Sequence, residues 1–402
     1  MKLKDIINEP NFCAAPWFHA VINPWGSVRP CNDFHGAFGK IQSYKKFSDL
    51  YNNDKFVNLR NTILEGKIHE GCVGCREKEK RIAWSKRISI LKQISNWDLF
   101  DTELTSISPT KNIIWLDMRL SNKCNLKCRH CYSSLSSKWA EDIPALKTTD
   151  IGKAYINNTI EYQACGETHL TFDHIADLAN NVGELRCLEF KGGEPFLNQK
   201  LINQFINYLK CDLKNIKLYV VTNGTVKLSD LTLDTLSQCK QLIYQISVEG
   251  TGNMFKYIRG IPLESIIDNI KIADTLDNVW IGFRITQMVY NIFEFPKVYD
   301  WIRALNLRHS PEINIQNYVV KPDFLNPLVL PLEVRMEARE TIMDFIKKHP
   351  GCDSSIPQFY KTLGKDSSDK NMKLLIMYTK AMDKIRGMSI NEAEPRIGRY
   401  IL

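Results

Sequence analysis

The chain has 402 residues, of which 44% are hydrophobic and 24% charged, and its formal net charge is +8. This composition is ordinary for a globular protein with room for two or three domains, and a charge of this size does not distinguish a nucleic-acid partner from none. No stretch approaches the ~20 apolar residues of a membrane-spanning helix, and the N-terminus lacks the apolar segment of a secretory signal, so we expect a cytoplasmic protein that does not enter a membrane. Twelve cysteines in such a chain indicate metal ligands or buried thiols rather than disulfides.

Residues 1–95 hold four cysteines with the spacing of metal ligands. The first two flank an alternating run around Gly26 that predicts a β-hairpin, a helical segment near Phe47–Leu64 follows, and the last two form a CxxC pair. Four thiolates saturate either one zinc ion or one iron–sulfur cube, so the ligand count leaves both open, a zinc ribbon included. The four candidate ligands are Cys13, Cys31, Cys72 and Cys75.

Two connecting segments come next. Residues 76–92 predict one basic amphipathic helix with a solvated charged face, and a substrate-binding role for its cations is the minor alternative. A stretch rich in Ser, Thr and Pro within residues 96–112 predicts a linker.

Between residues 113 and 320, strand and helix patterns alternate. This alternation predicts an α/β fold with a parallel sheet and right-handed crossovers. Six strand–helix units are too few for a closed eight-fold barrel, so we expect an open, partial (β/α)6 barrel with its reactive groups at the carboxyl ends of the strands. The candidate strands are Ile113–Leu120, Leu185–Lys191, Ile216–Thr222, Leu242–Val248, Val279–Gln287 and Glu312–Val319.

The loop after the first of these strands carries Cys124, Cys128 and Cys131, with Tyr132 directly behind them. Three thiolates can hold three irons of a 4Fe–4S cube and leave the fourth iron open, as a catalytic metal site requires. The alternatives are a zinc loop with His130 as a further ligand, or cysteines that only pack.

This CxxxCxxC pattern with an aromatic residue behind it resembles the signature of the radical S-adenosylmethionine (radical SAM) superfamily. The resemblance implies the partial barrel, a catalytic 4Fe–4S cluster on the three cysteines, and S-adenosylmethionine bound to the open iron. The upstream quartet is similar to the twitch or SPASM module of such enzymes, which implies a second, auxiliary 4Fe–4S cluster in preference to zinc. Two features depart from the family pattern: the module precedes the catalytic domain, and no further cysteines for another cluster lie nearby, so the one-cluster twitch form fits better.

The ends of the later strands carry polar motifs. A Gly-Gly-Glu-Pro segment lets a ligand approach the backbone and offers a carboxylate to an ammonium group, although by itself it also suits an ordinary strand-to-helix turn. Read with the cysteine loop, it resembles the family's motif for the amino group of S-adenosylmethionine, and an arginine beyond the fourth strand suits capture of the methionine carboxylate. The fifth strand lacks the glycine-rich adenine pattern, which leaves the adenine contacts open. The candidate cofactor contacts are Tyr132, Gly192, Gly193, Glu194, Pro195, Thr222, Asn223, Ser247, Glu249 and Arg259.

The other parts of the chain carry weaker signals. Residues 148–167 form an insertion that we interpret as a lid, and residues 321–402 predict helices that cap the sheet, with Asp383 and Arg386 as an intrahelical ion pair. The remaining cysteines lack ligand spacing and are Cys165, Cys187, Cys211, Cys239 and Cys352.

Together these patterns predict a radical SAM enzyme that cleaves S-adenosylmethionine reductively to a 5′-deoxyadenosyl radical and abstracts hydrogen from a substrate C–H bond. The resemblance implies an electron donor such as a flavodoxin or ferredoxin, and a peptide or protein as substrate. A nucleotide, nucleic acid or sugar is the enzymatic alternative, and a zinc-ribbon binding or assembly protein is the alternative from another class. The predicted domains are residues 1–95, 96–112, 113–320 and 321–402, and no catalytic acid or base is assigned.

Overall fold

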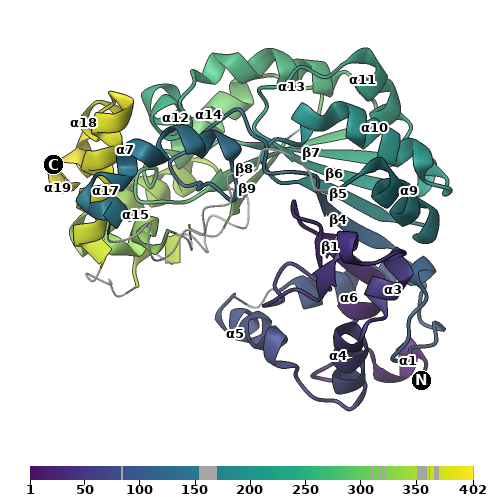
Figure 1. Ribbon diagram of the computed structural model, residues 1–402. Helices are drawn as coiled ribbons and strands as arrows, with labels where there is room; N and C mark the ends of the chain where they lie inside the picture. The colour runs from purple at the N-terminus through teal and green to yellow at the C-terminus, as the bar shows by residue number, and fades with distance from the viewer. Residues whose placement is uncertain are drawn as a thin grey trace. The chain divides into compact units, whose positions relative to one another are not determined.

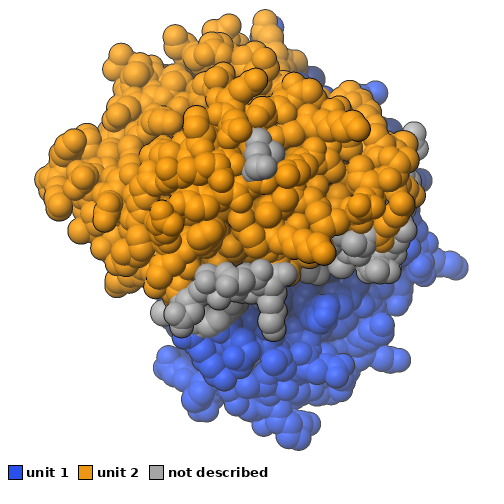
Figure 2. Space-filling model, turned by 90° about the vertical axis from the view of Figure 1, so that its left-hand side faces the viewer, with its two compact units in different colours: residues 1–121, 167–220, 230–242 blue, residues 122–166, 221–229, 243–402 orange. Residues whose placement is uncertain are grey.

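The computed structural model describes residues 1–82, 85–153, 170–309, 311–316, 319, 322–350, 360–361, 363–365 and 371–401. The chain divides into two compact units, which Figure 2 shows in blue and orange. The first comprises residues 1–121, 167–220 and 230–242, and the second comprises residues 122–166, 221–229 and 243–402. Cys165, Cys352 and most of the predicted lid lie outside the described residues. In the part of the chain that the structure describes, no helix is long and apolar enough to span a membrane.

The first unit is built on a sheet with the strand order β3-β2-β1-β4-β5-β6 (Figure 1). β1 and β2 form the predicted hairpin, in which Gly26 adopts a φ of +74° that favours glycine at the turn. β1 then pairs in parallel with β4, β4 with β5, and β5 with β6. The cysteine-bearing hairpin is therefore the edge of the same sheet as the first strands of the alternating region. The strands are β1 (His19–Ile22), β2 (Ser27–Arg29), β3 (Gly39–Lys40), β4 (Trp115–Arg119), β5 (Cys187–Lys191) and β6 (Lys217–Thr222), the last of which ends in the second unit.

Helices cover one face of β4–β6. Phe190 of β5 packs edge-on against Phe205 of α10, with 6.2 Å between the ring centres, and α9 lies beside α10 (Figure 1). Because successive side chains of a strand point to opposite faces, the apolar positions of these strands meet the helices and the others face away from them. The helices of this unit are α1 (Leu3–Ile6), α2 (Ala15–Phe18), α3 (Phe47–Tyr51), α4 (Asp54–Leu64), α5 (Val73–Ile82), α6 (Lys86–Asn96), α9 (Phe172–Asn181), α10 (Gln199–Tyr208) and α11 (Asp230–Ser237).

The single helix predicted at residues 76–92 is wrong. α5 ends at Ile82 and α6 begins at Lys86, because the side chain of Ser85 accepts a hydrogen bond from the backbone N–H of Ile88 and caps a new helix. Lys86 is also buried rather than solvated, with 7% of its surface exposed.

The second unit contains the strand order β7-β8-β9, in which β8 and β9 are parallel. Helix α12 ends at Gly260, whose left-handed φ of +81° is the usual C-terminal cap. The strands are β7 (Gln241–Ser247), which begins in the first unit, β8 (Val279–Thr286) and β9 (Glu312–Gln316). The helices are α7 (Ile143–Lys147), α12 (Gly252–Arg259), α13 (Ile267–Asp274), α14 (Phe295–Ala304), α15 (Leu332–Lys348), α17 (Met372–Arg386), α18 (Ile390–Ala393) and α19 (Pro395–Ile401).

The predicted fold class is confirmed: a mixed α/β protein with a mainly parallel sheet, an N-terminal hairpin and helix segment, and C-terminal helices. Each of the six predicted strands is present within a few residues of its predicted bounds. These strands were predictable because their apolar periodicity is a local property of the sequence.

Candidate metal centres

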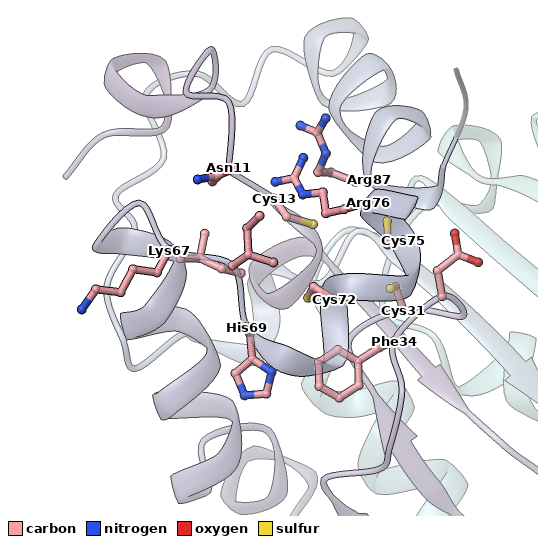
Figure 3. A pocket seen from close by; sticks show the side chains of 13 residues that line it. Asn11, Cys13, Cys31, Phe34, Lys67, His69, Cys72, Cys75, Arg76 and Arg87 are labelled. Carbon is pink, nitrogen blue, oxygen red and sulfur yellow. The ribbon is translucent and has the colours of Figure 1, made fainter. Parts of the chain in front are cut away.

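Four cysteines line one pocket of the first unit (Figure 3). They come from separate pieces of local structure: two flank the β1–β2 hairpin, Cys72 ends the 3₁₀ turn before α5, and Cys75 lies in the first turn of α5. The pocket brings together the quartet whose spacing predicted a metal site. Its cysteines are Cys13, Cys31, Cys72 and Cys75.

These thiols need a metal to lose their protons. Burial, with a smaller effect of the neighbouring thiols, raises the pKa of Cys13 to about 12 and the pKa of Cys72 to about 11. Cysteine binds metals as the thiolate, so the positive charge of a metal centre must replace these protons. Among the described residues, no three His, Cys, Asp or Glu side chains converge closely enough to hold a single ion. Thiols arranged around a pocket suit a multi-iron cluster, in which each thiolate binds a different iron.

Two arginines stand at the same pocket (Figure 3). Arg87 donates to the two carboxylate oxygens of Glu79, at 2.8 and 2.9 Å, and Arg76 lies 3.2 Å from this carboxylate. Burial alone would raise the pKa of Glu79, but the hydrogen bonds from Arg87 and Ser85 lower it to about 2. The ion-pair network fixes the guanidinium groups beside the thiols, where their charge offsets that of a thiolate-bound cluster.

The three-cysteine loop lies in the second unit. The backbone N–H of Leu126 lies 3.5 Å from the sulfur of Cys124, and the side-chain amide of Asn223 lies 3.8 Å from the same atom. A hydrogen bond from the Cys131 thiol lowers the pKa of Cys128 to about 6, against the opposing effect of burial. Hydrogen-bond donors that stabilise thiolates are what a cluster-binding loop requires.

The loop behind β6 carries two of the predicted cofactor residues to the cysteine loop. Asn223 donates to the Asn125 side chain at 3.0 Å, and Asn125 donates to the hydroxyl of Thr225 at 2.7 Å. The Thr222 hydroxyl accepts from the backbone N–H of Gly224 at 3.0 Å and shapes the turn. Asn223 thereby both orients the loop and reaches a cluster thiol.

Two other predicted cofactor residues pair with each other. Arg259 at the end of α12 donates to Glu249 at 2.6 Å, and both side chains are buried. Although burial opposes it, the carboxylate of Glu249 raises the pKa of Arg259, and the thiols of Cys128 and Cys131 add to the effect. The ring of His130 lies 4.0 Å from the second oxygen of Glu249. Arg259 thereby holds its guanidinium beside the thiols of Cys128 and Cys131, with Glu249 as its counter-ion.

The C-terminal helix α17 holds the cysteine loop from behind. Arg129, fully buried between two of the cysteines, lies 2.8 Å from Asp383 and stacks on the Tyr257 ring at 3.7 Å. The hydroxyl of Tyr378 donates to the backbone carbonyl of Arg129 at 2.8 Å. The expected intrahelical pair of Asp383 with Arg386 is wrong, because Asp383 binds Arg129 and Arg386 binds Asp142 at 2.8 Å. Each of these buried charges therefore pairs with a residue from a distant segment of the chain.

The Gly-Gly-Glu-Pro segment belongs to the first unit. Gly192 has a φ of +88° and Gly193 a φ of +53°, and a Cβ atom on Gly192 would come within 2.9 Å of Arg119. Glu194 is fully buried and accepts a hydrogen bond from the backbone N–H of Phe196 at 3.1 Å, which caps a short 3₁₀ helix. The segment therefore requires glycine for its backbone, and its carboxylate also has a structural role.

Comparison with known proteins decides the family. The model of the radical SAM superfamily matches residues 118–290, and the model of the SPASM iron–sulfur cluster-binding domain matches residues 13–76. The chain belongs to the radical SAM superfamily and carries a SPASM domain at its N-terminal end. The radical SAM family implies a 4Fe–4S cluster and S-adenosylmethionine as cofactors, and the SPASM domain implies auxiliary iron–sulfur binding.

The chain is also similar to individual proteins, all of them distant. An uncharacterized protein of Methanocaldococcus jannaschii is 24% identical over 180 residues, which are 44% of this chain and 53% of that protein. The chain thus spans about half the length of this curated relative. Among solved structures, native anSMEcpe with bound AdoMet is 16% identical with a TM-score of 0.36, over 62% of each chain. SuiB of Streptococcus suis bound to S-adenosylmethionine is 15% identical with a TM-score of 0.34, over 72% of this chain and 63% of that one.

The structure adds residues that the sequence motifs did not indicate. Asn291 donates to the backbone carbonyls of Glu249 and Thr286, at 2.8 and 3.0 Å, and so fixes the turn that carries Glu249. Arg129 was also missed. The one available signal in the sequence was its position between two cysteines of the loop, where a charged side chain that becomes buried needs an ion-pair partner. Of the other predicted residues, Ser247 ends β7, and the carbonyl of Tyr132 accepts from Leu135 at 2.8 Å to close the cysteine loop.

Proposed function

We propose that this radical SAM enzyme abstracts a hydrogen atom from a C–H bond of a peptide or protein, with its catalytic cluster on Cys124, Cys128 and Cys131. The observation that carries the proposal is the cysteine loop itself, which lies inside the radical SAM match and has the Leu126 N–H and the Asn223 amide directed at the sulfur of Cys124. When bound, the cluster and S-adenosylmethionine supply a hydrogen-abstracting radical through reductive cleavage of the sulfonium. The electron comes from a donor such as a flavodoxin or ferredoxin.

The residues around the loop bind, orient and exclude water. Asn223 holds the loop through Asn125 and reaches Cys124, while Arg259 brings positive charge to the cluster thiolates. We assign the methionine carboxylate to Arg259 and the amino group to Glu194, on the resemblance of both motifs to those of the family. For Arg259 this role requires the guanidinium to use donors that its Nε bond to Glu249 leaves open.

We further propose that the SPASM quartet holds one auxiliary 4Fe–4S cluster rather than zinc. Two features support iron–sulfur chemistry: the thiols surround a pocket instead of converging on one point, and Arg76 and Arg87 stand beside them. Bound there, an auxiliary cluster would supply an acceptor for an electron from the substrate, or would position the substrate. The peptide or protein substrate is proposed on the resemblance to twitch and SPASM enzymes.

Anaerobic reconstitution tests this function. We expect about eight iron and eight sulfide per chain, in the two-cube pattern, together with release of 5′-deoxyadenosine when reductant and S-adenosylmethionine are present. Mass spectrometry of peptides and proteins after the reaction then identifies the substrate. Stoichiometric zinc without S-adenosylmethionine cleavage would overturn the enzyme reading and favour a zinc-ribbon binding protein.

A further inference from the structure

The face of the first unit's sheet that lies away from α10 is charged. Asp117 and Arg119 occupy alternate positions of β4, and Glu189 and Lys191 occupy alternate positions of β5. Strands of a parallel sheet that are buried on both faces are normally continuous apolar runs. Burying two ion pairs costs desolvation energy that apolar side chains would avoid, so the sheet has no need of these charges for its own stability.

The register of the strands places like charges side by side. Asp117 pairs with Glu189, and Arg119 pairs with Lys191. Like charges at opposed positions of a sheet are destabilising, and a purely structural network would alternate the signs. Lys191 reaches back to Asp117 at 3.4 Å and also binds Glu189, so the two acids hold cations at the carboxyl edge of the sheet.

Glu189 is also held by Lys86 of α6 and by Trp115 of β4. Lys86 of α6 lies 3.3 Å from Glu189 and 3.5 Å from the centre of the Trp115 ring, and the indole N–H of Trp115 donates to Glu189 at 2.5 Å. His19 adds no charge, because burial and the nearby Lys86 lower its pKa to about 3. Glu189 is thus occupied by its own partners and is not open to a ligand.

Cations outnumber carboxylates on this face of the sheet. Arg29 of β2 lies on the same face as Asp117, since both pair with Val21 of β1. Four cations, Lys86, Arg29, Arg119 and Lys191, share this face of the sheet with two carboxylates.

The two arginines are oriented but not saturated. Arg119 donates through one terminal nitrogen to Asn32 at 2.6 Å, and Asn32 donates to Asp117 at 2.6 Å. The Nε atoms of Arg29 and Arg119 are buried and make no hydrogen bond to a described residue, and that of Arg119 lies 3.7 Å from the carboxylate of Asp117. The side chain of Arg119 is 32% exposed and that of Lys191 is 24% exposed, so the cluster can be reached from outside.

We infer that Arg29, Arg119 and Lys191 form an anion site that binds a carboxylate of the peptide substrate, either an acidic side chain or the C-terminus. The guanidinium fork suits a carboxylate, and Asp117 with Asn32 holds it in place. The site lies at the carboxyl ends of β4 and β5, the edge at which parallel α/β sheets gather their reactive groups. This inference rests on the proposed function, and it names the chemistry by which the substrate is held.

Ligand binding to the reconstituted full-length protein tests the site without turnover. The probes are N-acetylglutamate, which carries a side-chain and a terminal carboxylate, N-acetylglutamine, which keeps only the terminal one, the neutral N-acetylglutamine amide, and inorganic phosphate. Each is followed by the concentration dependence of the melting temperature. We expect N-acetylglutamate to stabilise the protein and N-acetylglutamine amide to have no effect. Stabilisation by N-acetylglutamine assigns the site to a C-terminal carboxylate, and no stabilisation by it assigns the site to an acidic side chain. Stronger stabilisation by phosphate would overturn the carboxylate assignment and indicate a phosphorylated substrate.

Variants locate the effect. Arg119→Gln should weaken N-acetylglutamate binding at least tenfold, and Arg119→Lys should restore part of it because the charge returns without the fork. Arg186→Gln is the matched control, because Arg186 directly precedes the first residue of β5, at the end of the strand away from the site, and pairs there with the exposed Glu184. This variant should bind N-acetylglutamate as the unaltered protein does. Equal binding by Arg119→Gln and the unaltered protein would contradict the inference.

Two further measurements keep the outcomes separate. If Arg119→Gln does not fold, Arg29→Gln replaces it, because Arg29 lies on the short strand β2 near the sheet edge. Release of 5′-deoxyadenosine is assayed independently in the unaltered protein. If the protein binds the anion but releases no 5′-deoxyadenosine, the anion site stands and the proposed function is wrong. If it releases 5′-deoxyadenosine but does not bind the anion, the proposed function stands and the anion site is wrong.

Discussion

At the scale of single residues, the buried imidazole of His19 gives the fold a dependence on pH. Its Nδ1 lies 2.8 Å from the carbonyl of Pro30, and its ring packs edge-on against Trp115. Burial and Lys86 lower its pKa from 6.5 to about 3. Between these two values the unfolded chain binds a proton that the folded chain does not, so the stability conferred by the neutral imidazole is complete above pH 6.5 and is lost as the pH falls.

His19→Asn should reduce this dependence, because the Asn amide can keep the bond to Pro30 and cannot be protonated. The loss of unfolding free energy attributable to His19 is about 1.4 kcal/mol per pH unit below pH 6.5. Denaturant titrations at pH 7.5 and pH 5.5 should therefore show a smaller drop in the variant than in the unaltered protein. The same drop in both would mean that His19 is not neutral in the fold.

At the scale of elements, helix α17 belongs to the predicted C-terminal helices, which the family resemblance does not cover, yet it fixes the cysteine loop. Asp383 receives Arg129, the hydroxyl of Tyr257 at 2.8 Å and the backbone N–H of Ile390 at 2.9 Å. One carboxylate thereby connects the cluster loop, α12 and the start of α18. Its removal leaves Arg129 as a buried charge without its ion-pair partner, which is strongly destabilising.

Asp383→Asn should therefore loosen the catalytic cluster and spare the auxiliary one. We expect the iron content after reconstitution to fall from about eight toward about four per chain, and the unfolding free energy to fall by about 3 kcal/mol. Glu392→Gln in α18 removes an exposed carboxylate and is the control, with no change expected in either quantity. Full retention of iron by Asp383→Asn would show that α17 does not support the loop.

The element scale also shows where sequence patterns reach their limit. The strands from β4 to β9 followed from apolar periodicity, and the break between α5 and α6 did not, because Ser85 can cap a helix or lie within one. Lys86 was expected in solvent for the same reason, since its partner Glu189 lies on a strand far along the chain.

At the scale of the whole molecule, the two sets of cysteines belong to different compact units and are proposed to have different roles. Cys128→Ala should reduce 5′-deoxyadenosine formation to background, because it removes one of the three cysteines proposed to hold the catalytic cluster, and two cysteines do not hold that cluster stably. Cys72→Ala should retain part of the substrate-independent cleavage, since it affects only the auxiliary site. Both variants should keep about four iron per chain. Equal loss of cleavage in two well-folded variants would contradict separate roles.

The sequence by itself indicated the family and the fold class of this protein. Ligand spacing within eight residues, a CxxC pair and the periodicity of the strands are local features, and they predicted both. The cysteines of the two centres are proposed as ligands from the same spacing. Only the tertiary structure decided which buried charges meet: Arg129 with Asp383, Arg259 with Glu249, and the cations beside Asp117. The physical reason is that a buried charge needs a partner nearby in space, and nothing in the local sequence states which distant segment will bring it.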